Sequence, residues 1–219
     1  MTQRDAFLER EGDAWFRRNR NMVEGLTLPD DDPILRNLLP LLRPDRPLRL
    51  LEIGCSGGRR LEWLGRELGV RCSGIDPSAE AVAEALARGI DAHRGTADSL
   101  PFGESAFDVV VFGFCLYLCD RADLFRIAAE ADRVLRMPGI LVIHDFYSAS
   151  PTTRVYHHRP ELASHKMDFG AMFSWHPDYV LMSRDLANED GRPAGDDANE
   201  WVATWVFHKR THDDRLGPE

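Results

Sequence analysis

The segment Glu52–Gly58 is the part of the sequence whose residue types best suit the binding of a polar ligand. It contains one acidic residue, three glycines and two small residues, Cys55 and Ser56. Glycine permits sharp turns and lets a ligand come close to backbone N–H groups. A glycine-rich loop between a strand and a helix binds polar or anionic groups through those N–H groups. The segment therefore predicts a ligand-binding loop.

The sequence on either side supplies the strand and the helix that such a loop needs. Leu48–Ile53 is mostly apolar and predicts a short buried strand, and Leu61, Leu64 and Leu68 follow at helical spacing. In a parallel α/β sheet this places the loop at the carboxyl end of the strand, where ligands bind. The alternative is an ordinary strand-to-helix turn that binds nothing.

Two common nucleotide-binding loops do not fit. A dinucleotide-binding G-x-G-x-x-G loop starting at Gly54 would need glycine in place of Ser56 and Arg59. A phosphate-binding P-loop would need a Gly-Lys-Ser/Thr sequence, which does not follow. The run from Glu52 to Gly58 instead resembles the first motif of class I S-adenosylmethionine-dependent methyltransferases, an acidic residue followed by G-x-G-x-G. Serine takes the place of the middle glycine.

Asp76 lies 22 residues after Gly54, at the end of a second predicted strand, and Pro77 follows it. A carboxylate there can accept hydrogen bonds from both ribose hydroxyls of an adenosine. The alternative is that Asp76 caps the predicted helix 79–88, although Ser78 can serve as that cap.

Three further segments resemble the small-molecule methyltransferase subfamily often called type 11. Residues 95–102 are similar to its G-D-A-E-x-L-P-F segment, residues 107–110 to its F-D-V-V segment, and residues 135–141 to its L-R-x-P-G-x-L segment. The resemblance covers about residues 46–146. It implies a Rossmann-like α/β fold with a seven-stranded, mostly parallel sheet, an antiparallel last strand and helices on both faces. It also implies S-adenosyl-L-methionine as the cofactor and methyl transfer as the activity.

The resemblance implies that the adenine ring faces Ala97, Asp98 and Ser99. Thr96 stands where the family usually has aspartate, so the group that would hold the adenine amine stays open between Asp98 and others. The backbone amide of Ala97 could donate to the ring whatever its side chain.

The fourth predicted strand, residues 105–112, is mostly apolar, as expected for a strand buried on both faces. Its carboxyl end would place Phe112, Gly113 and Phe114 beside the cofactor. Both phenylalanines have a second interpretation as core residues, because large aromatic side chains mostly contribute to burial.

Methyl transfer is an in-line displacement at an activated carbon, so alignment of the reactants supplies much of the catalysis. A general base is needed only where the acceptor loses a proton, as a hydroxyl does. The candidates are His144, His157 and His158, because imidazole accepts protons near neutral pH. The alternatives are a hydrogen-bonded core histidine at 144 and a solvated turn at 157–158. A metal site built from His144, Asp145 and His157 is not required by the spacing, and no metal is predicted.

Residues 148–172 show no helical or strand periodicity and predict an irregular segment that covers the acceptor. Residues 155–160 and 173–177 loosely resemble bacterial methyltransferases associated with sugar and surface-polysaccharide synthesis. Together these features favour a small polar acceptor that presents a hydroxyl. Two closing strands are expected at 173–183 and 201–209.

The first 44 residues are expected to form a helical cap, and residues 45–219 the methyltransferase domain. Residues 5–24 have the spacing of a helix with one apolar side. Such a helix either packs on the domain or covers the cofactor, with Trp15 or Arg20 near the ligand.

The net charge of −9 and the pI near 5.4 disfavour a nucleic-acid partner. No apolar run approaches the ~20 residues of a membrane span, and the start of the sequence lacks a signal peptide, so a cytoplasmic location and no membrane partner are expected. The four cysteines suit reduced core thiols. The oligomeric state is left open. Besides the methyltransferase, two function classes remain: a nicotinamide-dependent oxidoreductase, and a regulatory module that binds the cofactor without catalysis.

Overall fold

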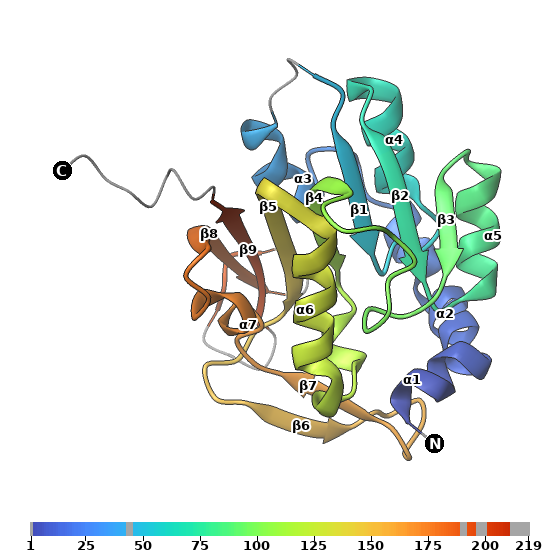
Figure 1. Cartoon of the computed structure of the whole chain (residues 1–219). Coiled ribbons are helices and arrows are strands. Elements are labelled where there is room, and N and C mark those ends of the chain that lie inside the picture. Colours follow the sequence, from blue (N-terminus) through green and yellow to red (C-terminus); the bar gives the residue numbers. More distant parts are fainter. Residues whose placement is uncertain (1, 43–45, 189–191, 196–200, 211–219) are drawn as a thin grey trace.

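A seven-stranded sheet runs through the molecule in the order β3-β2-β1-β4-β5-β9-β8 (Figure 1). The computed structural model describes residues 2–42, 46–188, 192–195 and 201–210. The strands of the sheet are β1 (Arg49–Ile53), β2 (Arg71–Asp76), β3 (Asp91–Arg94), β4 (Phe107–Gly113), β5 (Leu135–Phe146), β8 (Tyr179–Asn188) and β9 (Trp201–Lys209). Strands β1 to β5 are parallel, and β9 is antiparallel to both β5 and β8. The predicted sheet, with its antiparallel last strand, is confirmed.

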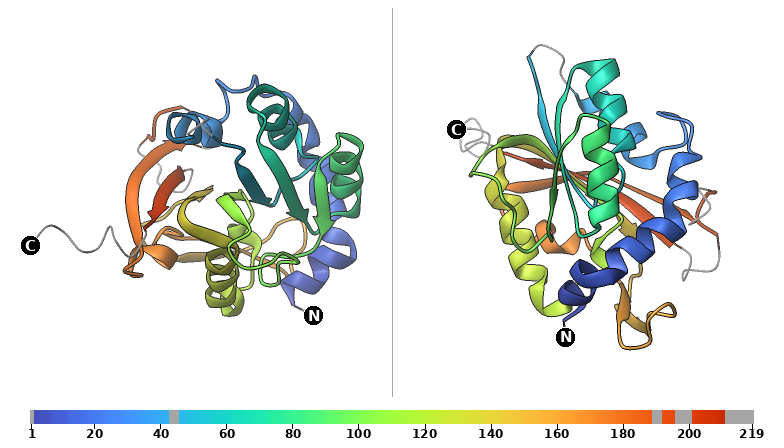
Figure 2. Two further views of the ribbon diagram at one scale, coloured as in Figure 1. Left: turned by 45° about the horizontal axis from the view of Figure 1, so that its top comes forward. Right: turned by 90° about the vertical axis from the view of Figure 1, so that its right-hand side faces the viewer.

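Helices cover both faces of this sheet (Figure 2). The α-helices are α1 (Gln3–Ala6), α2 (Gly12–Glu24), α3 (Pro33–Leu38), α4 (Arg59–Leu68), α5 (Ala79–Ala87), α6 (Leu124–Val134) and α7 (Ala171–Ser174). A π-helical turn, Phe7–Glu11, joins α1 to α2, and short 3₁₀ turns lie at Leu39–Leu41, Leu116–Leu118 and Arg121–Asp123. Apolar residues of α3, α4 and α5 pack on one face, and those of α6 and α7 pack on the other.

Strand β4 explains why the middle of the sheet is so apolar. Six of its seven residues are buried, from Phe107 to Phe112. Val110 and Phe112 belong to the core on the α6 face, whereas Val109 and Val111 belong to the core on the α3–α4 face. A strand with a helical layer on each side must be apolar at every position, which the sequence of β4 nearly satisfies.

The last third of the chain differs from the expected pattern in two places. The segment predicted to be irregular contains an antiparallel hairpin of β6 (Thr152–Val155) and β7 (Ala163–Lys166). The strand predicted from residue 173 begins at Tyr179, because α7 and the turn after it occupy residues 171–178. Both predictions were therefore wrong in these parts. The strand expected at 201–209 is confirmed as β9.

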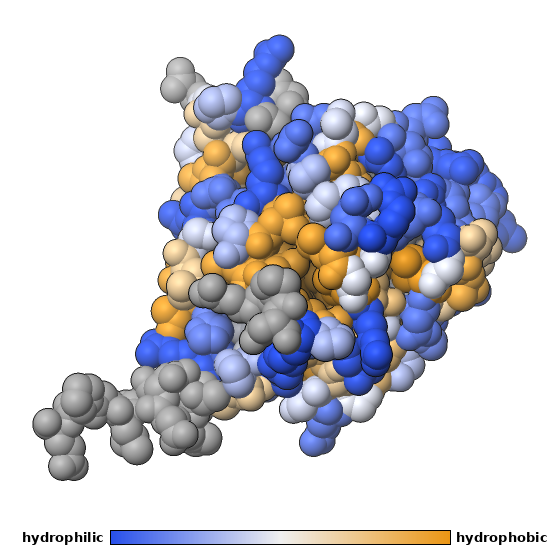
Figure 3. Space-filling view, turned by 90° about the horizontal axis from the view of Figure 1, so that it is seen from above, coloured by the Kyte–Doolittle hydropathy of each residue, from blue (hydrophilic) through white to orange (hydrophobic). Residues whose placement is uncertain are grey.

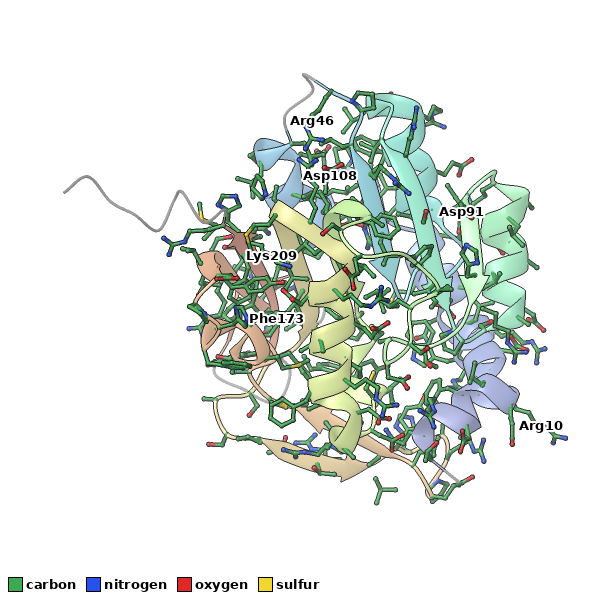
Figure 4. The ribbon with its side chains drawn as sticks, viewed as in Figure 1. Arg10, Arg46, Asp91, Asp108, Phe173 and Lys209 are labelled. Atoms are coloured by element: carbon green, nitrogen blue, oxygen red, sulfur yellow. The ribbon has the colours of Figure 1, made fainter. Side chains whose placement is uncertain are left out.

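The amino end of the sheet lies opposite the ligand-binding loop. Arg46 donates to Asp108 there at 2.8 Å (Figure 4). A cleft at this end is lined in part by Leu41, Leu48 and Met182, and Figure 3 views the molecule from this side, with apolar side chains gathered among hydrophilic ones. None of the helices in the described part of the chain has the length and apolar character that crossing a membrane requires.

Candidate active site

The loop after β1 takes the backbone shape that its glycines predict. Gly54 and Gly58 have φ angles of 79° and 75°, and Ser56 has a φ of 49°. A positive φ is less favourable for serine than for glycine, so the backbone of Ser56 needs a stabilising contact to keep this conformation. The N–H of Ser56 donates to Oδ2 of Asp76 at 2.9 Å, which ties the loop to the end of β2.

Asp76 is held so that its carboxylate faces the space beside the loop. Its Oδ1 accepts the N–H of Ser78 at 2.9 Å, and the hydroxyl of Ser78 accepts the N–H of Ala81 at 3.0 Å. Ser78 therefore caps α5, and Asp76 is not needed for that purpose. Burial raises the pKa of Asp76 to about 6, although the N–H groups of Ser78 and Ser56 oppose this rise.

A cavity, here called the first cavity, collects many of the predicted cofactor residues. Its volume is about 100 Å³. The predicted residues that line it are Gly54, Asp76, Pro77, Ala97, Asp98, Gly113 and Phe114. They come from the carboxyl ends of β1, β2 and β4 and from the segment after β3, as expected for a ligand at the edge of a parallel sheet.

The remaining predicted cofactor residues lie elsewhere. Glu52, Cys55 and Ser56 line an adjoining cleft instead. Gly58 precedes α4, and Ser99 is exposed. Phe112 is fully buried in the core on the α6 face, which agrees with its structural interpretation.

The N-terminal helices supply a wall of the first cavity that the sequence did not identify residue by residue. Arg4, Phe7, Gly12 and Trp15 line it. Arg4 Nη1 lies 2.8 Å from Asp98 Oδ2. Burial alone would raise the pKa of Asp98. Hydrogen bonds from Thr96 and Arg4 outweigh this effect, so the pKa is lowered and the carboxylate stays ionised. Of the two residues expected near the ligand, Trp15 lines the cavity and Arg20 does not; Arg20 pairs with Glu84.

A glycine permits this close approach of the N-terminal helices. A Cβ atom at Gly12 would lie 2.7 Å from the carbonyl oxygen of Phe7 and 3.0 Å from the amide nitrogen of Ser78. Those are backbone atoms, which cannot rotate away. Helix α2 can therefore sit directly against the turn that carries Asp76 and Ser78 only with glycine at this position.

The adjoining cleft, here called the second cleft, has a volume of about 590 Å³. It meets the first cavity at four residues that line both: Trp15, Gly54, Gly113 and Phe114. Phe114 stands at this junction with a φ of 61°. Its N–H donates to the carbonyl oxygen of His144 at 2.9 Å, and its ring packs 5.5 Å from the His144 ring.

His144 lies in the second cleft near the end of β5. Its Nδ1 is 2.9 Å from Oγ1 of Thr204 on β9, and its Nε2 has no hydrogen-bond partner among the described residues. Burial, aided by the positive charge of Arg60, lowers the pKa of His144 to about 4. The imidazole is therefore neutral at neutral pH, and a neutral imidazole can accept a proton.

Below the loop, a buried ion-pair network borders the second cleft. Arg60 Nε lies 2.8 Å from Asp32 Oδ2, and the same guanidinium contacts Glu52. Burial raises the pKa of Glu52 to about 7, and the nearby Arg60 opposes that rise. The network joins β1, α3 and α4 beside the loop, so it stabilises the fold around Gly54.

The other two candidate bases do not join His144. His157 and His158 follow β6 in the hairpin, are exposed, and line neither the first cavity nor the second cleft. Their rings lie 4.0 Å apart. Asp145 is buried and accepts the N–H of Leu116 at 2.7 Å. His144, Asp145 and His157 therefore do not form a common site, and the described residues contain no group of three or more metal-binding side chains.

Comparison with known proteins agrees with this geometry. Residues 51–143 match the model of the methyltransferase domain family. An uncharacterized methyltransferase of Synechocystis sp. is 32% identical over 104 residues, which cover 47% of this chain and 49% of that protein. The ubiquinone biosynthesis O-methyltransferase of Azorhizobium caulinodans is 32% identical over 109 residues, which cover 47% of this chain and 42% of that protein. The chain spans about half the length of these curated relatives.

A solved structure extends the likeness to nearly the whole fold. The 1,6-didemethyltoxoflavin-N1-methyltransferase of Burkholderia thailandensis was crystallised with 1,6-didemethyltoxoflavin and S-adenosylhomocysteine. It superposes with a TM-score of 0.71 and 17% identity, covering 94% of this chain and 89% of that one. The matched segment and the strand order lead to one conclusion: residues 51–143 of this chain are similar to the methyltransferase domain family, and the chain has the fold of a solved methyltransferase structure.

Proposed function

We propose that the chain transfers a methyl group from S-adenosylmethionine in the first cavity to a small polar acceptor in the second cleft. The observation that carries this proposal is the junction of the two spaces at Trp15, Gly54, Gly113 and Phe114. In-line displacement needs nucleophile, methyl carbon and sulfur on one line, and two spaces that meet at a short boundary favour such alignment.

The residues of the first cavity suit the parts of the cofactor. Asp76 would present its carboxylate to the ribose hydroxyls, and we assign Ala97 and Asp98, which also line the cavity, to the adenine ring, as the family resemblance implies. The sulfonium and the amino-acid part would lie toward Gly54 and Gly113, nearest the second cleft. The bound cofactor supplies the activated methyl carbon, and the chain supplies binding, orientation and exclusion of water.

His144 is the residue that we assign to proton removal. As the acceptor oxygen bonds to the methyl carbon, the carbon–sulfur bond breaks and its electron pair stays on sulfur. The hydroxyl proton then passes to Nε2 of His144, while Thr204 holds Nδ1. This role favours a hydroxyl acceptor, and the Azorhizobium relative that acts as an O-methyltransferase is consistent with it.

The described part of the N-terminal segment, residues 2–42, and the hairpin region 148–172 are proposed to form one cover over the site; residues 1, 43 and 44 of the expected cap lie outside the described residues. Gln3 Nε2 donates to the carbonyl oxygen of Leu118 at 2.8 Å, and the amide of Ala163 in β7 donates to Gln3 Oε1. Arg18 on α2 donates to the Tyr156 hydroxyl at 2.8 Å. If this cover opens for ligands, its amides exchange hydrogen faster than those of β4 in the free protein, and more slowly with cofactor bound. If the amides of the cover are as protected from exchange as those of β4 in the free protein, the two segments are a fixed part of the fold and do not open.

Calorimetric titration tests the function directly. S-adenosylmethionine and S-adenosylhomocysteine should bind, and NAD should not. Binding of NAD alone would favour the oxidoreductase alternative. Methylation of any small hydroxyl compound, detected as formation of S-adenosylhomocysteine, separates an enzyme from a regulatory module.

A further inference from the structure

The second cleft contains a cationic side chain that makes no ion pair with any described residue. Three arginines line the cleft. Arg60 pairs with Asp32 and Glu52, and Arg59 lies 3.7 Å from Glu24. Arg36 has no ion pair and no hydrogen bond within the described part of the chain, and the charge that acts on it from the cleft lining is that of Asp31, whose pKa Arg36 helps to lower. It is therefore available to a ligand.

Helix α3 holds Arg36 in a defined place. Ile34, Leu35 and Leu38 are fully buried against the sheet, and Asp32 caps the helix by accepting the N–H of Leu35 at 3.0 Å. Arg36 lies on the exposed side of this anchored helix and reaches the cleft. A side chain on an anchored helix positions a ligand better than one on a free loop.

The charges that act on His144 come mainly from arginines, whereas exposed carboxylates also line the cleft. Arg60 from α4 and Arg36 from α3 both act on His144 and disfavour its protonation, whereas Asp32 favours it. Asp185 on β8 is paired in register with Thr204, which is paired with His144, so these three residues form a row across the sheet. Asp30, Asp31 and Asp185 are exposed and also line the cleft.

We propose that the methyl acceptor carries an anionic group, a carboxylate or a phosphate, that binds Arg36. Guanidinium binds both groups through paired hydrogen bonds. An acceptor with only positive charge would meet Arg36 and Arg60 close to His144. The carboxylates of Asp30, Asp31 and Asp185 limit the negative charge that the cleft tolerates, so a single anionic group fits better than several. This inference rests on the proposed methyl transfer and names the class of its substrate.

Binding of the anion has a second effect in this arrangement. It offsets the charge of Arg36, which is one of the two cations that disfavour protonation of His144. The imidazole then becomes a stronger base when the acceptor is present. The anionic group would thus contribute both to affinity and to proton removal, through one guanidinium.

Matched pairs of small molecules test the proposal without knowledge of the acceptor. Glycolate, glucuronate and 4-hydroxybenzoate are compared with their uncharged amides by ligand-observed NMR on the protein with S-adenosylhomocysteine. At least one acid should bind about tenfold more tightly than its amide, as expected for a charge-assisted contact. Arg36→Gln should abolish that preference, and Arg36→Lys should keep part of it. Arg10→Gln is the matched control, because Arg10 is an exposed arginine on the N-terminal helix, outside both spaces (Figure 4).

Several results would overturn the proposal. One is equal binding of acids and amides, and another is an acid preference that survives in Arg36→Gln. A third is a preference for amines that Asp185→Asn removes. The His144 imidazole signals give a second readout, because saturating acid should raise its pKa in the wild type and not in Arg36→Gln. Failure of the cofactor to bind in the calorimeter would count against the proposed methyl transfer, and the acid preference can still be measured on the cofactor-free protein.

Discussion

Nδ1 of His144 and Oγ1 of Thr204 lie 2.9 Å apart on the neighbouring antiparallel strands β5 and β9. Because the two residues are paired in register, the sheet itself sets their spacing. This contact fixes one ring nitrogen and leaves the other without a hydrogen-bond partner among the described residues. The imidazole is therefore oriented by backbone geometry and not by a loop.

The first prediction concerns His144 itself. His144→Gln should slow methyl transfer to a hydroxyl about 10²- to 10⁴-fold, because a positioned general base contributes about that much. The dissociation constant for S-adenosylmethionine, measured by calorimetry, should hardly change. The control is the double variant His157→Ala and His158→Ala, whose side chains lie outside both spaces and should leave the rate unchanged. A slow double variant would mean that the hairpin reaches the acceptor during turnover.

Thr204 is expected to act through His144 and not on the substrate. Thr204→Val keeps the shape of the buried side chain but removes the oxygen at 2.9 Å, so the ring loses its orientation. Turnover should fall about tenfold, by analogy with other orienting hydrogen bonds of about 1–1.5 kcal/mol. Thr204→Ser should restore most of the rate. If valine and serine behave alike in single-turnover measurements, the contact has no orienting role.

The pH dependence follows from the depressed pKa of His144. Burial lowers this pKa to about 4, so the free enzyme holds a neutral imidazole throughout pH 5–8. His144 should therefore contribute no acid limb to kcat/KM near pH 6.5, where an ordinary histidine would produce one. A limb near pH 6 that persists in His144→Gln would come from Asp76, whose pKa is about 6. Loss of activity through this residue is expected only as the pH falls toward about 4. An acid limb near 6.5 that disappears in His144→Gln would contradict the neutral, buried ring.

Asp76 provides a prediction for the cofactor. Asp76→Ala should weaken S-adenosylmethionine binding by about 1.5–3 kcal/mol, or about ten- to a hundredfold, through loss of charge-assisted hydrogen bonds to ribose. Calorimetry measures the affinity, and the melting temperature reports on the fold. Asp91→Ala is a useful control, since Asp91 is an exposed acid at the other end of the neighbouring strand β3. If Asp76→Ala melts normally and binds S-adenosylmethionine with wild-type affinity, Asp76 does not bind the cofactor.

Gln3 offers a test of the cover. Its side chain joins α1 to the backbone of Leu118 and of Ala163, and it is buried. Gln3→Ala leaves a carbonyl and an N–H without this partner, so the free energy of unfolding should fall by about 1–3 kcal/mol. Urea denaturation measures the loss. The exposed neighbour Glu9 supplies the control, as Glu9→Ala should be nearly neutral. Equal stability of the two variants would mean that water replaces the amide.

Much of the sheet and of the loop could be predicted because their signals are local. Glu52–Gly58 directly follows an apolar run, and Asp76 ends the second predicted strand just before Pro77, so the sequence alone places both at the carboxyl ends of strands. Arg4 shows the opposite case. It meets Asp98 from a position 94 residues away, and nothing in its neighbourhood distinguishes it from an exposed arginine such as Arg10. Tertiary contacts alone bring it to the site.

The hairpin of β6 and β7 was not predictable for a related reason. Its strands, Thr152–Val155 and Ala163–Lys166, contain few apolar residues and show no regular alternation. Their pairing is supported by contacts with distant residues, such as that of Lys166 Nζ with the Phe146 ring at 3.8 Å from its centroid. A segment whose order depends on its neighbours looks irregular when it is read alone.

The first cavity is covered by the N-terminal helices, whereas the second cleft reaches the surface. This difference predicts the order in which substrates bind and products leave. Arg4, Phe7 and Trp15 cover the first cavity, whereas the second cleft reaches exposed residues such as Asp30 and Arg36. A methylated product can leave past those residues while the spent cofactor stays beneath the helix. We therefore expect an ordered sequential mechanism in which S-adenosylmethionine enters first and S-adenosylhomocysteine departs last. Product inhibition reveals it: S-adenosylhomocysteine should compete with S-adenosylmethionine alone, and the methylated product should be noncompetitive toward both substrates.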